Sequence, residues 1–211
     1  MSVSMPQKAA STLSKPMPKY SKHILSELSK ADYVTLAAIT AITCSFWLLW
    51  HELTELAIAL AFVSTFLDYV DGTVARRFGG SPYGKVLDSL YDVLGWVFFP
   101  ALVINIQTNW AWWSVIVTTI FCVFAVIRLS RFTVGGYVES DKRYYVGLPV
   151  LFSKYALLLV YIAGASLSVA IIAAMIPMMV SSKRIPKPRP WTAQIELIYA
   201  LVFVWLYFYH A

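Results

Sequence analysis

The chain has little charge, few cysteines and few histidines for its length. Of its 211 residues only 13% are Asp, Glu, Lys or Arg, whereas 59% are hydrophobic. The two cysteines, Cys44 and Cys122, lie inside apolar segments, so neither a disulfide framework nor a cysteine zinc site is indicated. The three histidines are scattered, and we assign them no chemistry. No apolar stretch follows the basic N-terminus closely, which argues against a cleavable signal peptide.

Long apolar segments dominate the rest of the chain. The clearest are Tyr33–Trp50, Leu53–Leu67, Val93–Ile106, Trp110–Ile127, Leu148–Val180 and Ile195–Tyr209. A helix needs about 20 apolar residues to cross a bilayer core of about 30 Å, and runs without alternation favour helices over barrel strands. A soluble protein with a large buried core would explain so many long runs poorly. We therefore predict an all-α integral membrane protein with about six to seven transmembrane helices.

The predicted spans cover about 33–50, 54–75, 83–105, 110–131, 147–163, 167–182 and 193–210. The last span of the main membrane domain (32–182) is separated from its neighbour by GASLS at 164–168, whose small residues suit a tight reversal. A tail over 1–19 is predicted to be disordered, and a basic loop over 183–192 precedes a C-terminal helix over 193–211. Residues 20–31 suit an amphipathic helix on the membrane surface, with a solvated linker as the alternative.

The positive charges alternate with the apolar segments. All 17 Lys and Arg residues fall into four groups, Lys8–Lys30, Arg76–Lys85, Arg128–Lys154 and Lys183–Arg189. The positive-inside rule places all four groups and the N-terminus in the cytoplasm. This placement explains the net charge of +6 without a nucleic-acid partner. A prokaryotic inner membrane is the expected location, although an endomembrane would obey similar rules.

One charged stretch, Asp68–Asp92, interrupts the apolar pattern. Asp68 and Asp71 are three residues apart, Asp88 and Asp92 are four apart, and each pair shares a helix face. The turn Gly79–Pro82 makes an antiparallel hairpin that brings the four carboxylates together near the cytoplasmic boundary. A solvated, salt-bridged loop is the simplest alternative, but it explains poorly why these acids lie so far along their helices.

Hard oxygen ligands without neighbouring His or Cys favour Mg²⁺, Mn²⁺ or Ca²⁺. Four carboxylates suit two ions, and two-metal sites suit displacement at phosphorus. The nearby cations Arg76, Arg77 and Lys85 indicate that an anion binds as well. An ion channel or transporter would also use membrane acids, but these acids cluster at one interface beside arginines that would repel a cation.

The pattern D-x-x-D-G-x-x-A-R-x7-G-x3-D-x3-D resembles the signature of the CDP-alcohol phosphotransferases, which are membrane enzymes of phospholipid synthesis. It is met by Asp68, Asp71, Gly72, Ala75, Arg76, Gly84, Asp88 and Asp92. The resemblance implies that the enzyme displaces CMP from a CDP-linked lipid with an alcohol, using Mg²⁺ or Mn²⁺. It implies that the four aspartates are metal ligands and that Asp92 or Asp88 acts catalytically, with Asp92 as a candidate general base.

The same resemblance assigns the cytidine diphosphate to a second set of residues: Asp68, Gly72, Ala75, Arg76, Gly84, Asp32 and Thr35. Direct displacement is preferred, because the motif holds no activated Ser, Cys or His. A homodimer is implied by the family alone.

Four further stretches resemble the phosphatidylserine synthases of this family: ADYVTL (31–36), RLSRFTV (128–134), YYVGLPV (144–150) and MVSSKRI (179–185). They imply CDP-diacylglycerol as donor and L-serine as acceptor. Thr133 stands where Asn is usual, and Leu151 replaces a Pro. The acceptor-binding candidates are Arg128, Arg131 and Lys154, for which membrane anchoring by the arginines and snorkelling by Lys154 are alternatives. Glycerol 3-phosphate, inositol, inositol phosphate or another alcohol remains the competing acceptor.

Overall fold

The computed structural model describes residues 24–135, 144–186 and 192–210. In these ranges the chain is mostly helical, with one antiparallel strand pair, β1 (Tyr144–Val146) and β2 (Arg184–Pro186). The α-helices are α2 (Lys30–Trp50), α3 (Thr54–Phe78), α4 (Gly84–Asp92), α5 (Phe99–Gln107), α6 (Trp112–Gly135), α7 (Lys154–Ala163), α8 (Ala165–Val180) and α9 (Thr192–His210). Shorter segments of other helical types are η1 (Ile24–Glu27), η2 (Val93–Phe98) and η3 (Val150–Ser153).

The all-α membrane architecture is confirmed. Within the described ranges, four helical segments are long and apolar enough to cross a membrane: Lys30–Trp50, Thr54–Phe78, Gly84–Gln107 and Trp112–Arg131. Three further apolar helices are shorter, Val150–Ala163, Ala165–Val180 and Gln194–Tyr209. Each of the seven predicted spans therefore corresponds to a helix, while a count of six to seven membrane crossings stays a prediction.

The start of α2 differs from the expected amphipathic helix over 20–31, which is not confirmed where the structure describes it. Ser29 caps α2: its hydroxyl accepts a hydrogen bond from the Asp32 N–H at 3.3 Å, and the Asp32 carboxylate accepts one from the Ser29 N–H at 2.5 Å. This reciprocal capping box begins a new helix at Lys30, so η1 is separate from it. The predicted tail over 1–19 and residues 187–191 of the predicted basic loop lie outside the described residues.

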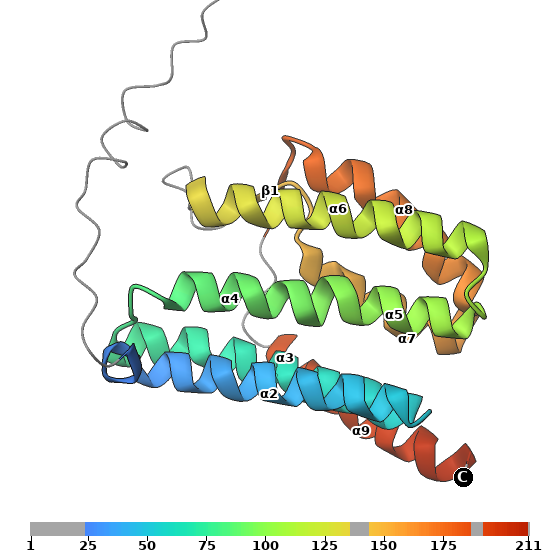
Figure 1. The fold of residues 1–211 in the computed structure, drawn as a ribbon, viewed down its shortest axis with the longest axis horizontal. Coiled ribbons are helices and arrows are strands. Elements are labelled where there is room, and N and C mark those ends of the chain that lie inside the picture. Colours follow the sequence, from blue (N-terminus) through green and yellow to red (C-terminus); the bar gives the residue numbers. More distant parts are fainter. Residues whose placement is uncertain (1–23, 136–143, 187–191, 211) are drawn as a thin grey trace, which may run out of the picture.

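The helices form a layered bundle (Figure 1). Helices α2, α3 and α9 pack together on one side, and α6 packs with α8 on the other. The continuous run α4–η2–α5 passes between these groups and contacts α2, α6 and α7. Its large side chains Tyr91, Trp96 and Phe99 are fully buried, together with Phe62 of α3. This central run therefore holds the core of the bundle and carries two of the motif aspartates.

The run contains a π-helical segment, η2, directly after Asp92. Pro100 is the second residue of the following α-helix, α5, and has no N–H to donate to the carbonyl of Trp96 four residues earlier. The Ser153 hydroxyl donates to that carbonyl instead, at 2.5 Å. Ser153 thus joins the start of α7 to the central run at Trp96, four residues after the last motif residue, Asp92. π-helical segments frequently occur at functional sites.

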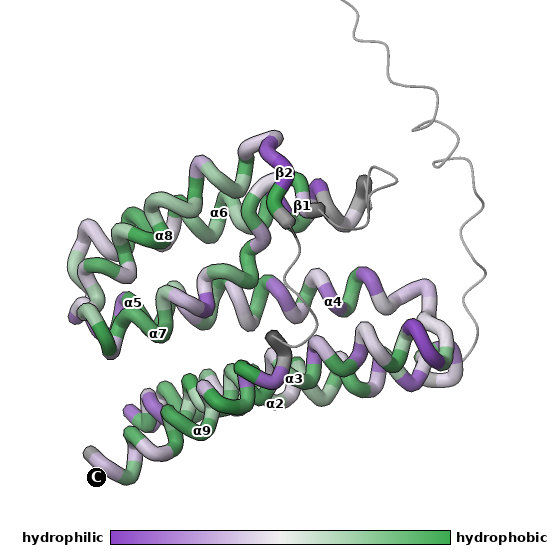
Figure 2. Tube along the Cα trace, turned by 180° about the vertical axis from the view of Figure 1, so that it is seen from behind, coloured by the Kyte–Doolittle hydropathy of each residue, from purple (hydrophilic) through white to green (hydrophobic). Residues whose placement is uncertain are grey.

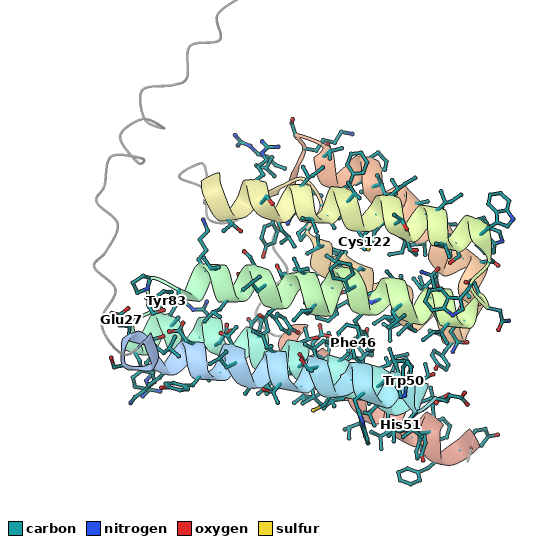
Figure 3. The ribbon with its side chains drawn as sticks, viewed as in Figure 1. Glu27, Phe46, Trp50, His51, Tyr83 and Cys122 are labelled. Atoms are coloured by element: carbon teal, nitrogen blue, oxygen red, sulfur yellow. The ribbon has the colours of Figure 1, made fainter. Side chains whose placement is uncertain are left out.

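Basic residues gather at one end of the bundle, which we call the basic end. The start of α2, the end of α3, the start of α4 and the end of α6 meet there, and hydrophilic residues are concentrated at that end in Figure 2. Figure 3 shows Glu27 and Tyr83 at this end and Trp50 and His51 at the opposite one. Exposed Trp47, Trp50, Trp110 and Trp112 occupy that opposite end, as expected of an interfacial aromatic belt.

The predicted reversal at 164–168 is confirmed as a break between two helices, and it is tighter than expected. Helix α7 ends at Ala163 and α8 begins at Ala165, with Gly164 alone between them at φ +87°. A glycine adopts this backbone conformation without the steric cost of a Cβ. The two short helices therefore pack against each other as a hairpin.

Candidate active site

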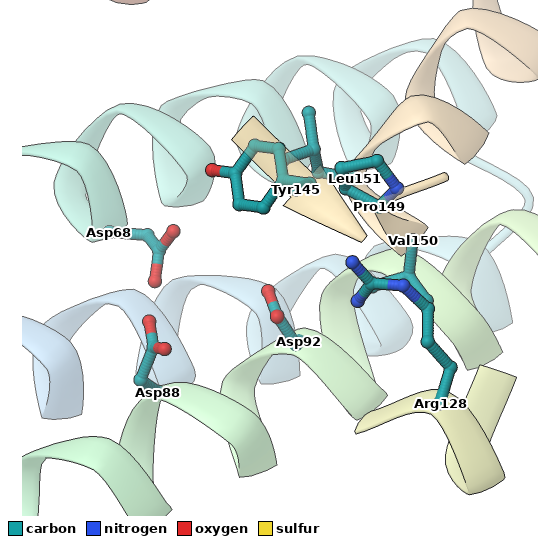
Figure 4. A pocket seen from close by; sticks show the side chains of 8 residues that line it. All are labelled: Asp68, Asp88, Asp92, Arg128, Tyr145, Pro149, Val150 and Leu151. Atoms are coloured by element: carbon teal, nitrogen blue, oxygen red, sulfur yellow. The ribbon is translucent and has the colours of Figure 1, made fainter. Parts of the chain in front are cut away.

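A polar cavity of about 180 Å³ lies between α3, α4 and α6 (Figure 4). Its lining residues are Asp68, Asp88, Asp92, Arg128, Tyr145, Pro149, Val150 and Leu151. In Figure 4 the carboxylates of Asp68, Asp88 and Asp92 point toward one another, and the Arg128 guanidinium lies on the Asp92 side. The structure thus brings together three of the four predicted metal ligands and one predicted acceptor ligand.

Helix geometry places the carboxylates well inside the bundle. Asp68 lies ten residues before the end of α3 at Phe78, and Asp92 lies eight residues after the start of α4 at Gly84. At 1.5 Å of rise per residue, both lie about 12–15 Å from the basic end. The turn after Phe78 reverses the chain at Gly79, which has φ +89°, as the predicted hairpin requires.

Asp71 belongs to the neighbourhood of the cavity but does not line it. It is buried on the side of α3 that faces α2, where its carboxylate accepts a hydrogen bond from the Thr35 hydroxyl. Thr35 also donates to the Ala31 carbonyl of its own helix at 3.2 Å. This hydrogen bond orients Asp71, while the predicted contact of Thr35 with the nucleotide stays a prediction.

The donor set fits a hard cation, although the side chains are not assembled around one. Among the described residues, no three Asp, Glu, His or Cys side chains lie close enough to surround a metal ion as they stand. Asp68 Oδ1 is buried and accepts no hydrogen bond, so it has an unmet need for a donor or a cation. Three carboxylates facing a single guanidinium also leave an excess of negative charge, which a divalent cation would offset.

The expected cytidine diphosphate residues extend from the cavity toward the basic end. Arg76 is exposed, and its guanidinium donates to the Thr73 hydroxyl at 2.8 Å. A Cβ at Gly72 would meet Arg76 Nη1 at 3.5 Å, an ordinary contact, so the fold alone does not require a glycine there. Close approach of a ligand to Gly72 therefore stays a prediction, as does the contact of half-buried Ala75.

Gly84 has a clear structural role. A Cβ there would meet the Asp32 carboxylate at 3.2 Å, which is tighter than most real contacts. Asp32 is buried and belongs to the capping box of α2. The glycine therefore lets the start of α4 approach the start of α2, and its contact with the nucleotide stays a prediction.

The three acceptor candidates have separate positions. Arg128 lines the cavity, but Arg131 is exposed on α6 and is not among the lining residues. Three helical residues rise about 4.5 Å, so Arg131 lies nearer the basic end than Arg128 does. Arg131 is therefore not part of the cavity lining, and its contact with the acceptor stays a prediction.

Lys154 also does not line the cavity. It is buried at the start of α7 and forms an ion pair with buried Glu196 of α9. Its ammonium lies 5.9 Å from the ring centroid of Trp96 and 5.4 Å from that of Tyr155. Burial contradicts the snorkelling alternative, because the ammonium meets a carboxylate inside the bundle instead of reaching the interface.

One wall of the cavity was not predicted. Tyr145 was not among the predicted site residues, yet it lines the cavity with Pro149, Val150 and Leu151. Gly147 (φ +73°) docks this segment on the end of α8: its N–H donates to the Lys183 carbonyl at 2.9 Å. A Cβ at Gly147 would stand 2.5 Å from the Met179 carbonyl oxygen. The Gly-Leu-Pro signal could have identified the wall, since it marks a place where backbones meet closely.

A polar bridge holds α4 against the end of α6. The hydroxyls of Ser89 and Thr133 are 2.7 Å apart, and the Lys85 ammonium donates to the Thr133 carbonyl at 2.6 Å. Thr133 is the residue that departs from the usual Asn. Its contacts explain how a threonine serves there, because it fixes the spacing between the helices that carry Asp88 and Arg128.

A family model described as CDP-alcohol phosphatidyltransferase matches residues 28–210 of this chain. The match covers every described helix of the bundle from α2 to α9. It includes all residues of the cavity and all of the motif from Asp68 to Asp92.

Three named relatives are similar over parts of the chain. A CDP-diacylglycerol–serine O-phosphatidyltransferase of Mycobacterium leprae is 27% identical over 203 residues, 89% of this chain and 67% of that protein. An archaetidylserine synthase of Methanothermobacter thermautotrophicus is 29% identical over 138 residues, 62% of this chain and 58% of that protein. A CDP-diacylglycerol–serine O-phosphatidyltransferase of Helicobacter pylori is 33% identical over 94 residues, 43% of this chain and 39% of that protein. The chain thus spans less than two thirds of the archaeal and Helicobacter relatives.

Proposed function

This chain belongs to the CDP-alcohol phosphatidyltransferase family and is a transferase, and from that premise we propose that it moves a phosphatidyl group from CDP-diacylglycerol to L-serine. The products are phosphatidylserine and CMP. The observation that carries the proposal is the cavity itself, where three motif carboxylates and one guanidinium meet inside an apolar bundle. The ion-pathway hypothesis is set aside, because the family is one of transferases.

The carboxylates would hold Mg²⁺ or Mn²⁺, with two ions shared among Asp68, Asp71, Asp88 and Asp92. Bound there, the cations would offset the charge of the pyrophosphate and make CMP a better leaving group. The buried, unpartnered Oδ1 of Asp68 supports this role. So does the Thr35 hydrogen bond, which orients Asp71 from the α2 side.

Asp92 is the proposed general base. The serine hydroxyl oxygen bonds to the phosphorus that carries the diacylglycerol, the bond from that phosphorus to CMP breaks, and the hydroxyl proton passes to the carboxylate. Asp92 lies on the Arg128 side of the cavity (Figure 4), so a substrate carboxylate held by the guanidinium would bring its hydroxyl near Asp92. Tyr145 and Pro149 cover that region and would help to exclude water.

Several observations favour serine over a phosphorylated acceptor. The cavity of about 180 Å³ is small for a ligand pocket, which disfavours a bulky acceptor such as inositol phosphate. Of its lining residues in the described ranges, Arg128 alone is cationic, whereas a phosphate would call for more positive charge. Serine also appears in the names of all three relatives.

The nucleotide would bind between the cavity and the basic end, against Gly72, Ala75 and Arg76. That end would face the cytoplasm under the positive-inside rule, in a prokaryotic inner membrane. The nucleotide could then stay in water while the acyl chains stay in lipid. A homodimer is part of the proposal on the family resemblance alone.

An acceptor panel tests the proposal. Purified protein in detergent–lipid micelles would receive CDP-diacylglycerol, Mg²⁺ or Mn²⁺ and one acceptor: L-serine, glycerol 3-phosphate, inositol or inositol phosphate. We expect CMP release with L-serine and none with the phosphorylated acceptors. Release with another acceptor but not with serine would reject serine while keeping the reaction class. The matched control is Asp92→Asn, which should release little CMP with any acceptor.

A further inference from the structure

A buried ion pair between Lys154 and Glu196 joins α9 to the segment η3–α7, whose first residues, Val150 and Leu151, line the cavity. Val150 begins the short helical segment η3, and Lys154 begins α7 directly after that segment. Ser153 precedes Lys154, and its hydroxyl donates to the carbonyl of Trp96 at 2.5 Å. Trp96 lies four residues after Asp92 on the central run. The ammonium is also near enough to Asp68 for the two charges to interact.

Glu196 has an unusual environment for a carboxylate in an apolar helix. It is buried on α9, where one oxygen binds Lys154 and the other, Oε2, accepts no hydrogen bond. Isolated buried charges are costly, and an ion pair offsets that cost only partly. Hydrophobic side chains of similar volume would pack at such a position without this penalty. The pair is therefore better explained by what it does to Lys154 than by the stability of the bundle.

We propose that Glu196 is a positioning residue that determines acceptor specificity, because it holds Lys154 away from the cavity and so disfavours phosphorylated acceptors. With Lys154 neutralised, the cavity presents the single guanidinium of Arg128 to the acceptor. One guanidinium matches one carboxylate of a zwitterionic amino acid, whereas a phosphate carries about twice that charge and calls for a second cation. Lys154 is positioned to be that cation if its partner is removed, since a lysine side chain is long and flexible.

The test is competition by O-phospho-L-serine, measured as its inhibition constant against L-serine in the CMP-release assay. In Glu196→Gln the inhibition constant should fall about tenfold or more, the effect of one added charge-assisted hydrogen bond. The double variant Lys154→Met/Glu196→Gln should lose this gain, which a merely structural role of Glu196 would not produce. An unchanged inhibition constant in folded Glu196→Gln, or the same gain in the double variant, would overturn the inference.

A charge-swapped variant covers the case in which Glu196→Gln does not fold. Lys154→Glu/Glu196→Lys keeps a buried pair but places a carboxylate directly after the segment that lines the cavity with Val150 and Leu151. It should bind O-phospho-L-serine more weakly than the wild type does, and equal or tighter inhibition would contradict the inference. The inference rests on the proposed function, and the two fail differently. If the wild type does not use serine, the function is wrong; if it does and the variants show no change, only the role of Glu196 is wrong.

Discussion

Gly147 offers the sharpest test of how the cavity wall is built. The substitution Gly147→Ala would place a Cβ 2.5 Å from the Met179 carbonyl oxygen and 3.0 Å from that of Ser181. Carbon–oxygen contacts are normally about 3.3 Å or longer, so the segment must move by about 0.8 Å. The φ of +73° adds about 1–2 kcal/mol of backbone strain for any residue with a Cβ.

The expected result is a loss of activity that exceeds the loss of stability. A displacement of about 1 Å at a reacting site can cost about a hundredfold in rate, so kcat/KM for L-serine should fall between about 10- and 100-fold. CMP release would be measured per mole of folded protein, with thermal unfolding followed in parallel. The wall residues Tyr145 and Pro149 move with the segment, so the defect should be largest at low serine concentration.

Gly164→Ala is the matched control. Its φ of +87° imposes comparable backbone strain, but a Cβ there meets nothing within 4 Å, and the residue lies in the α7–α8 turn away from the cavity. It should lower the Tm and leave kcat/KM of the folded protein unchanged. Wild-type kcat/KM in Gly147→Ala, or an equal loss in Gly164→Ala, would refute the argument that the docked segment shapes the cavity.

Two further substitutions test the assigned roles of the motif. Asp92→Asn removes the proposed base, so kcat should fall by about 10²–10⁴ while the affinity for CDP measured by equilibrium binding changes much less; full activity would remove Asp92 from that role. Thr35→Val removes the hydroxyl that donates to Asp71. Hydrogen bonds to charged groups contribute about 1.5–3 kcal/mol. The Mg²⁺ concentration for half-maximal CMP release should therefore rise about tenfold. Thr40→Val, an exposed position on the same helix, should leave that concentration unchanged, and an equal rise there would show that the Thr35 effect is not specific.

The parts of the site that were predictable depend on local spacing. The hairpin from Asp68 to Asp92 follows from helix periodicity and one glycine turn. These local features place its acids on facing helix surfaces independently of how the other helices pack. The seven apolar helices follow in the same way from the length of each run. Even here the prediction missed that Asp71 turns toward α2, because its partner Thr35 is 36 residues away in sequence.

The parts that were not predictable depend on contacts between distant segments. The partner of Lys154 lies 42 residues away on α9, and no local pattern links the two. Tyr145 reaches the cavity only because Gly147 docks on carbonyls at the end of α8, more than 30 residues later. Arg131, three residues after Arg128, is exposed near the end of α6, and its contact with a bound acceptor stays a prediction.

The most direct test of the account is a double measurement of transfer. Wild-type protein would be incubated with CDP-diacylglycerol, a divalent cation and isotopically labelled L-serine, and both the label in extracted lipid and the CMP in the aqueous phase would be quantified. The account predicts that labelled phosphatidylserine and CMP form in equal amounts and that Asp92→Asn forms little of either. CMP formed without label in the lipid, or labelled lipid formed without CDP-diacylglycerol, would contradict it.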